Sequence, residues 1–165
     1  MQSTEILIYE DEEIWVMNKP SGLPSAPLPR DPMAETAVSL ALKLCPEIRQ
    51  GFPAEAIEPG LLHRLDTGTS GLLAFAKNPE SFQRFKRLWT SHEITKTYRA
   101  IAPLPGKDQH HWIEHPLQLF MGHDEKSSKR MRAFLDSKKA SGIRGKALPT
   151  WTEVQEVRSL QSELT

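Results

Sequence analysis

The sequence has a single cysteine and no long apolar run. Cys45 alone cannot form an internal disulfide or a zinc site with several cysteines, which excludes disulfide-stapled domains and zinc fingers. No stretch reaches the roughly 20 apolar residues that a membrane-spanning helix needs. The first residues also lack the apolar segment of a signal peptide. These absences predict a cytoplasmic protein, and the length of 165 residues fits one domain over residues 1–165.

The sequence also lacks a net charge, because 21 basic residues balance 21 acidic ones. The charges are unevenly distributed along the chain. Residues 1–80 carry 6 Lys and Arg against 12 Asp and Glu, whereas residues 81–165 carry 15 against 9. The basic half is where a polyanion would dock. An ordinary solvated surface is the alternative, and charge alone does not separate the two.

Strands dominate the predicted elements and helices are few, so the pattern predicts an α+β fold. Helices are expected to begin at Asp31-Pro32, with Pro46 ending the first, and at Asn78-Pro79. Residues 103–150 are polar and are expected to be irregular. The predicted strands are two within 5–19 about an acidic turn, then 71–77, 95–103 and 149–157.

The triplet Asp66-Thr67-Gly68 matches the active-site signature of aspartic proteases. Those enzymes need two carboxylates that share one proton, so a chain with one such triplet would have to dimerise. In an extended segment Arg64 would lie on the same face as Asp66 and keep the carboxylate ionised, which opposes that chemistry. A dimeric aspartic protease is therefore a minor alternative. An aspartate kept ionised by arginine can act as a nucleophile or an electrostatic partner, or it can form a structural Arg–Asp pair at a turn, and these residues alone favour the structural pair.

Three segments in order carry a more specific pattern: VMNKPSGL at 16–23, LLHRLDTGTSGLLAFAKN at 61–78 and KTYRAIA at 96–102. Together they closely resemble the RluA-type family of RNA pseudouridine synthases. The resemblance implies an isomerase that breaks the N-glycosidic bond of specific uridines in structured RNA, rotates the base and rejoins it through carbon. It implies a mixed, mainly antiparallel central sheet with flanking helices and an RNA-binding cleft, and neither a metal nor a cofactor. The implied partner is ribosomal or transfer RNA.

The resemblance also implies roles for individual residues. Asp66 would be the essential aspartate, and Arg64 would pair with it before RNA binds and then fill the gap left by the flipped uridine. Tyr98 would stack on the flipped uracil, which recovers about 1–3 kcal/mol of the cost of extruding the base. The predicted RNA-binding residues are His63, Asn18, Lys19, Lys96, Lys126, Lys129, Arg130 and Arg132.

Members of that family continue into a Gly-Arg-x-His-Gln-Ile-Arg segment, and this sequence ends at Thr165 without it. The resemblance therefore predicts a catalytic domain that is incomplete at its C-terminal end. Such a domain would have little activity and would self-associate along an exposed sheet edge. A non-catalytic RNA-binding remnant of the family is the alternative function.

Overall fold

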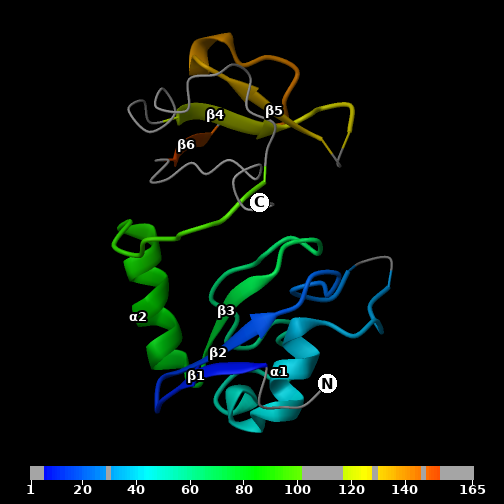
Figure 1. The fold of residues 1–165 in the computed structure, drawn as a ribbon, viewed down its shortest axis with the longest axis vertical. Coiled ribbons are helices and arrows are strands. Elements are labelled where there is room, and N and C mark those ends of the chain that lie inside the picture. The colour runs from blue at the N-terminus through cyan, green and yellow to red at the C-terminus, as the bar shows by residue number, and fades with distance from the viewer. Residues whose placement is uncertain (1–5, 29–30, 102–116, 128–129, 146–147, 153–165) are drawn as a thin grey trace, which may run out of the picture. The chain divides into compact units, whose positions relative to one another are not determined.

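The computed structural model describes residues 6–28, 31–101, 117–127, 130–145 and 148–152. The chain divides into two compact units, Met1–Tyr98 and Arg99–Thr165. Each unit contains a three-stranded antiparallel sheet (Figure 1). The predicted α+β class and antiparallel pairing are confirmed, with the strands divided between two sheets. A single catalytic domain over 1–165 stays a prediction.

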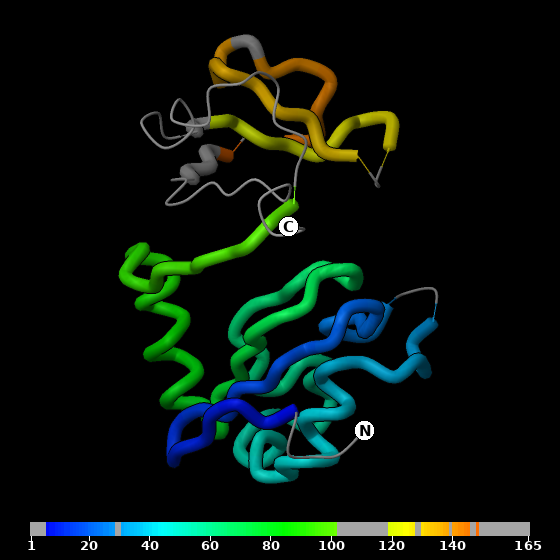
Figure 2. The backbone as a smooth tube through the Cα atoms, in the orientation of Figure 1, coloured from blue at the N-terminus to red at the C-terminus, as the bar shows by residue number. Residues whose placement is uncertain are grey.

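The sheet of the first unit has the order β1-β2-β3, with β1 at Leu7–Glu10, β2 at Ile14–Lys19 and β3 at Gly71–Ala76. The turn between β1 and β2 forms because the Asp11 carboxylate accepts backbone N–H bonds from two residues beyond it, both at 2.8 Å. The register pairs Lys19 with Gly71. The loop after β2 and the loop before β3 therefore lie at the same end of the sheet (Figure 2).

The first helix begins later than the sequence predicted. Helix α1 spans Ala37–Leu44 and is capped by Thr36, whose hydroxyl accepts the Ser39 N–H while the Ser39 hydroxyl accepts the Thr36 N–H. Asp31 instead closes a short turn by donating its N–H to the Leu28 carbonyl at 3.0 Å. The prediction of a helix start at Asp31-Pro32 is wrong, because the reciprocal cap at Thr36 satisfies two terminal N–H groups. A short 3₁₀ helix, η2, follows at Pro46–Arg49.

Helix α2 spans Pro79–Thr90 and begins as the sequence predicted. The Asn78 side chain accepts the Ser81 N–H at 2.8 Å, and Pro79 occupies the first helical position, where no N–H is needed. Arg84 forms an ion pair with Glu13, which directly precedes β2. These contacts fix α2 directly after β3.

The core of the first unit lies between β2, β3 and α1. Alternate residues of β2 point inward, so Trp15, Met17 and Lys19 are all buried. The Trp15 ring packs edge-on against Phe75 of β3, with centroids 5.9 Å apart. The other residues of this core are Ala26, Ala37, Val38, Ala41, Cys45, Ile48, Leu61, Leu65 and Leu73.

Residues 95–101 do not form the predicted strand, and no strand pairs with them in the described part of the chain. Their alternation of side chains fits an extended segment, but a strand needs a neighbour to receive its backbone hydrogen bonds. The side chains of Tyr98 and Ile101 are accordingly exposed. The prediction of a strand here is wrong for these residues.

The second unit corrects the prediction that residues 103–150 are irregular. Its sheet has the order β5-β4-β6, with β4 at Leu117–His123, β5 at Met131–Phe134 and β6 at Leu148–Thr152. A short 3₁₀ helix, η3, lies at Ser137–Lys139. The predicted last strand is confirmed over its described residues, and its remainder, 153–157, lies outside them. Self-association along a sheet edge stays a prediction.

None of the helices in the described ranges is both long and apolar enough to cross a membrane. The same ranges hold no cluster of three or more His, Cys, Asp or Glu side chains that would suit a metal ion.

Candidate active site

The Asp66 carboxylate lies on an exposed turn. The residues that lead into this turn, 60–65, form its stem, and the stem is anchored in the core. The Thr69 N–H donates to the Asp66 carbonyl at 3.0 Å and closes the turn. Leu65, the preceding residue, is buried. The hydroxyl of buried Ser25 donates to the Leu65 carbonyl at 2.6 Å and accepts the Leu65 N–H at 3.0 Å. The carboxylate therefore faces solvent from a fixed backbone.

The stem also pairs with the outer edge of β3. Leu62 donates its N–H to the Ala74 carbonyl at 3.1 Å, and Gly60 accepts the Ala76 N–H at 2.8 Å. These bonds place residues 60–62 beside β3, on the edge that β2 does not occupy. They set the direction in which the chain approaches Asp66.

The loop after β2, residues 20–25, clasps the Asp66 turn from the other side. The Gly22 N–H donates to the Thr67 carbonyl at 2.7 Å. The Ser21 hydroxyl donates to the Gly68 carbonyl at 2.8 Å. Both carbonyls belong to residues that directly follow Asp66. The two motif segments, 16–23 and 61–78, are thus one structural site, which their resemblance to one family anticipated.

Lys19 bonds to both the loop after β2 and the Asp66 turn. Its side chain is fully buried, and its ammonium donates to the carbonyls of Pro20 at 3.0 Å, Leu23 at 2.7 Å and Thr67 at 3.3 Å. Burial lowers the pKa of Lys19, and the nearby negative charge of Asp66 acts against that shift. Three carbonyls can accept all three ammonium hydrogens. The prediction that Lys19 contacts RNA is therefore corrected to a role in holding the site together.

Replacing Lys19 with methionine should lower the free energy of unfolding of the first unit by about 2–4 kcal/mol, because three carbonyls lose the buried ammonium that bonds them together. Methionine keeps most of the apolar stem, so packing changes little. Urea unfolding followed by circular dichroism measures the loss. Lys43→Met on the exposed end of α1 is the matched control and should change stability by less than about 0.5 kcal/mol. Equal stability of the two variants would contradict the anchoring role.

Arg64 is paired with Glu58, not with Asp66. Its guanidinium forms a hydrogen-bonded ion pair with the Glu58 carboxylate, which raises the pKa of Arg64. No Arg64–Asp66 ion pair occurs in the described structure, so that prediction is wrong. The expectation assumed an extended segment through Asp66, whereas the turn begins at that residue. The positive charge beside Asp66 in this structure is that of Lys19.

His63 connects the approach to Asp66 with helix α2. Its ring stacks on Trp89, with centroids 4.9 Å apart and planes inclined by 23°. Its Nε2 accepts the Ala74 N–H at 3.3 Å. Burial, together with the charges of Lys96 and Lys86, lowers the pKa of His63. A neutral ring suits this arrangement because Nε2 must accept a hydrogen bond.

The remaining predicted residues lie at different places. Asn18 is exposed at the end of β2, beside the two loops. Lys96 lies over the Trp89 ring at 5.2 Å, and Tyr98 is 59% exposed two residues later. The predicted basic residues of the second unit are Lys126, Arg130 and Arg132, all exposed, whereas Lys129 lies outside the described residues.

Sequence reasoning missed two residues of the site. Ser25 bonds both backbone groups of Leu65, and Glu58 holds Arg64. A serine in a proline-rich loop gives no signal of such a partner 40 residues away in sequence. Glu58 lies six positions before Arg64 in a segment with no regular pattern, so nothing in the sequence marks the two as partners.

The chain belongs to a family of RNA-modifying enzymes. The family model described as RNA pseudouridylate synthase matches residues 13–153, which include both loops of the site and most of the second unit. The chain is therefore a member of the RNA pseudouridylate synthase family. Membership accounts for Asp66-Thr67-Gly68 without an aspartic protease, because the triplet is part of the longer segment that the family shares.

Individual relatives agree with this family. The chain is 35% identical over 96 residues to ribosomal large subunit pseudouridine synthase D of Borreliella burgdorferi, covering 58% of this chain and 29% of that protein. It is 29% identical over 137 residues to an uncharacterized RNA pseudouridine synthase, YlyB, of Bacillus subtilis, covering 81% and 42%. The chain thus spans less than half the length of either relative.

A solved structure has the same fold. The human RNA pseudouridylate synthase domain containing 1 protein superposes with a TM-score of 0.57 at 20% identity, covering 92% of this chain and 52% of that one. At this level of identity the likeness concerns the fold alone.

Proposed function

We propose that the chain forms part of an enzyme that converts specific uridines to pseudouridine in structured RNA, with Asp66 as its essential carboxylate. The observation that carries the proposal is the clasp of residues 20–25 around the exposed Asp66 turn, in a member of this family. The geometry fixes the backbone on both sides of one carboxylate and leaves the carboxylate itself accessible. That arrangement suits a group that must reach a large polymeric substrate.

The proposed reaction is an isomerisation. The bond between C1′ of the ribose and N1 of the uracil breaks, the base turns, and a bond forms between C1′ and C5. The hydrogen of C5 leaves as a proton, and N1 gains one. Asp66 acts at the sugar or on the base, as a nucleophile or as a proton acceptor. No oxidant, reductant or added group is required for balance.

Arg64 and Tyr98 are proposed to hold the RNA while the base is out of the stack. The uridine must be flipped out, which costs a few kcal/mol. Tyr98 is exposed and can stack on the extruded uracil. The Arg64 side chain is 65% exposed, and an exposed ion pair such as Arg64–Glu58 contributes at most about 1 kcal/mol. Arg64 can therefore leave Glu58 and stack in the gap within the RNA.

Release of tritium from RNA that carries [5-³H]uridine tests the proposal, because C5 loses its hydrogen only when the new carbon–carbon bond forms. Carbodiimide mapping of the product then locates the modified position. We propose ribosomal RNA as the first substrate to test, since the name of the Borreliella relative refers to the large ribosomal subunit. Transfer RNA is the second. RNA binding without tritium release would favour the non-catalytic alternative.

Charge reversal in the second unit should weaken RNA binding. Replacing Lys126, Lys129, Arg130 and Arg132 with glutamate should lower the slope of log affinity against log salt by about 0.7–0.9 for each phosphate that the variant no longer neutralises. Fluorescence anisotropy with a labelled RNA at several salt concentrations measures the slope. Lys43→Glu in the first unit gives the effect of a single charge reversal outside this cluster. An unchanged slope in the variant with all four substitutions would identify the cluster as ordinary solvated surface.

A further inference from the structure

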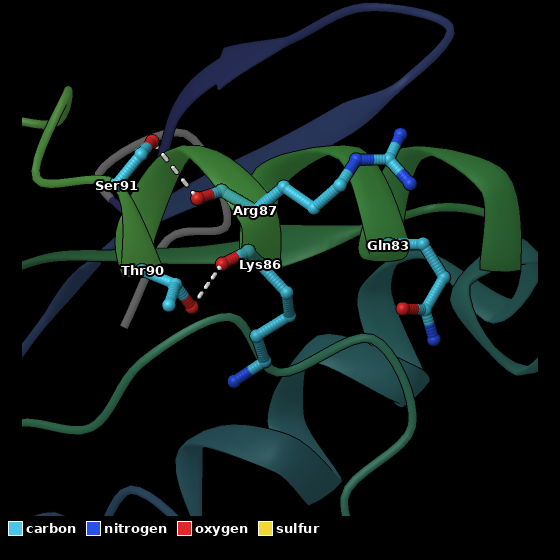
Figure 3. Close-up of a pocket in the computed structure, with 5 residues that line it drawn as sticks. All are labelled: Gln83, Lys86, Arg87, Thr90 and Ser91. Carbon is cyan, nitrogen blue, oxygen red and sulfur yellow. Dashed lines mark hydrogen bonds between the residues drawn. The ribbon is translucent and has the colours of Figure 1, made fainter.

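One side of helix α2 carries an open hollow, lined by polar and charged residues, that the proposed catalytic site does not use. It has a volume of about 450 Å³ and is lined by Gln83, Lys86, Arg87, Thr90 and Ser91. These residues follow one another at helical spacing, and the Lys86 and Gln83 side chains extend to the same side of the helix (Figure 3). The hydroxyls of Thr90 and Ser91 donate to the carbonyls of Lys86 and Arg87, at 2.9 Å and 3.0 Å.

The two cations of this hollow are available for an anion. Neither Lys86 nor Arg87 has an ion-pair partner within the described structure, whereas Arg84 on the same helix is paired with Glu13. Lys86 gives one hydrogen to the Leu62 carbonyl at 3.0 Å, which leaves two further donors. Within the described residues these two cations are therefore not paired with a carboxylate, and the acidic group bonded at this face is Glu93, which accepts from the Ser91 hydroxyl at 2.5 Å.

The same part of α2 contacts the segment that carries Asp66. The Lys86 ammonium bonds the Leu62 carbonyl, and the His63 ring stacks on Trp89. Lys96 lies over the Trp89 ring. The basic side of the helix is thus joined by direct contacts to residues three and four positions before Asp66. A ligand strand that reaches Asp66 has this surface beside it.

We propose that the α2 basic face, defined as Gln83, Lys86, Arg87, Thr90, Ser91 and Lys96, binds the phosphate backbone of the substrate RNA next to the flipped uridine. This proposal rests on the proposed function. The helical part of the face is about 12 Å long, which leaves room for more than one phosphate. Lysine and arginine supply charge, and the Gln83 amide adds a hydrogen-bond donor for phosphate oxygens, whereas the Thr90 and Ser91 hydroxyls are already bonded to helix carbonyls.

An RNA backbone fits this face better than a membrane does. Helices that bind membrane surfaces place aromatic and aliphatic side chains beside their cations. Aromatic rings of α2 instead pack within the unit, since Trp89 stacks on His63 and Phe82 lies edge-on to Phe52. Contact with the Asp66 segment also suits a ligand whose neighbouring nucleotide enters the catalytic site.

Reversal of the Lys86 and Arg87 charges tests the proposal. The Lys86→Glu/Arg87→Glu variant should bind a fluorescein-labelled RNA hairpin with uridines in its loop roughly tenfold or more weakly, with a salt slope lower by about 0.7–0.9 for each phosphate left without its cation. Arg84→Gln is the matched control on the same helix, because Glu13 already neutralises Arg84. It should bind RNA as the unchanged chain does. Equal affinity of all three proteins would overturn the proposal.

Further measurements separate this proposal from the proposed function. Because Lys86 also holds Leu62, Arg87→Glu alone is tested in parallel and should weaken binding with an unchanged circular dichroism spectrum, while a negative charge in the last turn of α2 should cost at most about 1 kcal/mol of stability. If the charge reversals in the second unit weaken RNA binding and those on α2 do not, the α2 face is wrong and the function stands. If the unchanged chain binds no RNA, or if phosphatidylserine vesicles bind α2 in preference to the hairpin, the α2 proposal fails as well.

Discussion

Replacing Asp66 with asparagine should abolish pseudouridine formation, with a loss of rate on the order of 10⁴-fold, while RNA affinity changes little. Asparagine has the shape of aspartate, but its amide can act neither as the nucleophile nor as the proton acceptor. The carboxylate makes no hydrogen bond to the described part of the chain, and the turn is held by backbone groups. The substitution should therefore leave the clasp intact. Tritium release measures turnover, and fluorescence anisotropy measures binding.

The control for this variant is Asp31→Asn, which makes the same chemical change at an exposed aspartate of the same unit. It should keep full turnover. Thermal melting of both variants shows whether either one has lost its fold. Turnover retained by Asp66→Asn would remove Asp66 from the reaction. Loss of RNA binding together with turnover would assign it to substrate binding instead.

Local signals were sufficient where neighbouring residues determine the structure. The turn at Asp11 and the start of α2 at Asn78-Pro79 each depend on a side chain that bonds backbone groups two or three positions away. The start of α1 was missed because Asp31-Pro32 and Thr36 both have the residue types of a helix start. Only the reciprocal bonds between Thr36 and Ser39 decide between them.

The candidate site depends on contacts that sequence spacing does not encode. Lys19 reaches the Thr67 carbonyl across 48 positions, and its charge suggested exposure. The alternation of β2 nevertheless carried a signal, since Trp15, Met17 and Lys19 occupy one face and the first two are strongly apolar. Residues 95–101 show the opposite case: the alternation was present, but it says nothing about whether a neighbouring strand exists.

Gly60→Ala is expected to lower the free energy of unfolding of the first unit by about 3–5 kcal/mol, a large part of the stability of a small domain. Gly60 is buried at the start of the segment that leads to Asp66, and its φ of +71° lies in the left-handed region. A Cβ there would lie 2.3 Å from the Ala76 carbonyl oxygen and 2.9 Å from Cγ2 of Ile48. The oxygen belongs to backbone that is paired within the sheet, so it cannot move aside cheaply.

Two other glycines separate the causes of this loss. Gly22→Ala adds a side chain at a φ of +90° with no atom within 4 Å, so it should cost only the backbone strain of about 1–2 kcal/mol. Gly68→Ala has neither a positive φ nor a close neighbour, and it should change stability by less than about 0.5 kcal/mol. Urea unfolding of the three variants measures the order of their stabilities.

Because Gly60 accepts the Ala76 N–H that aligns residues 60–62 with β3, the Gly60→Ala variant should also displace Asp66 and lose turnover at temperatures where it remains folded. Similar stability of the Gly60 and Gly68 variants would show that the packing of Gly60 against β3 is looser than this structure requires.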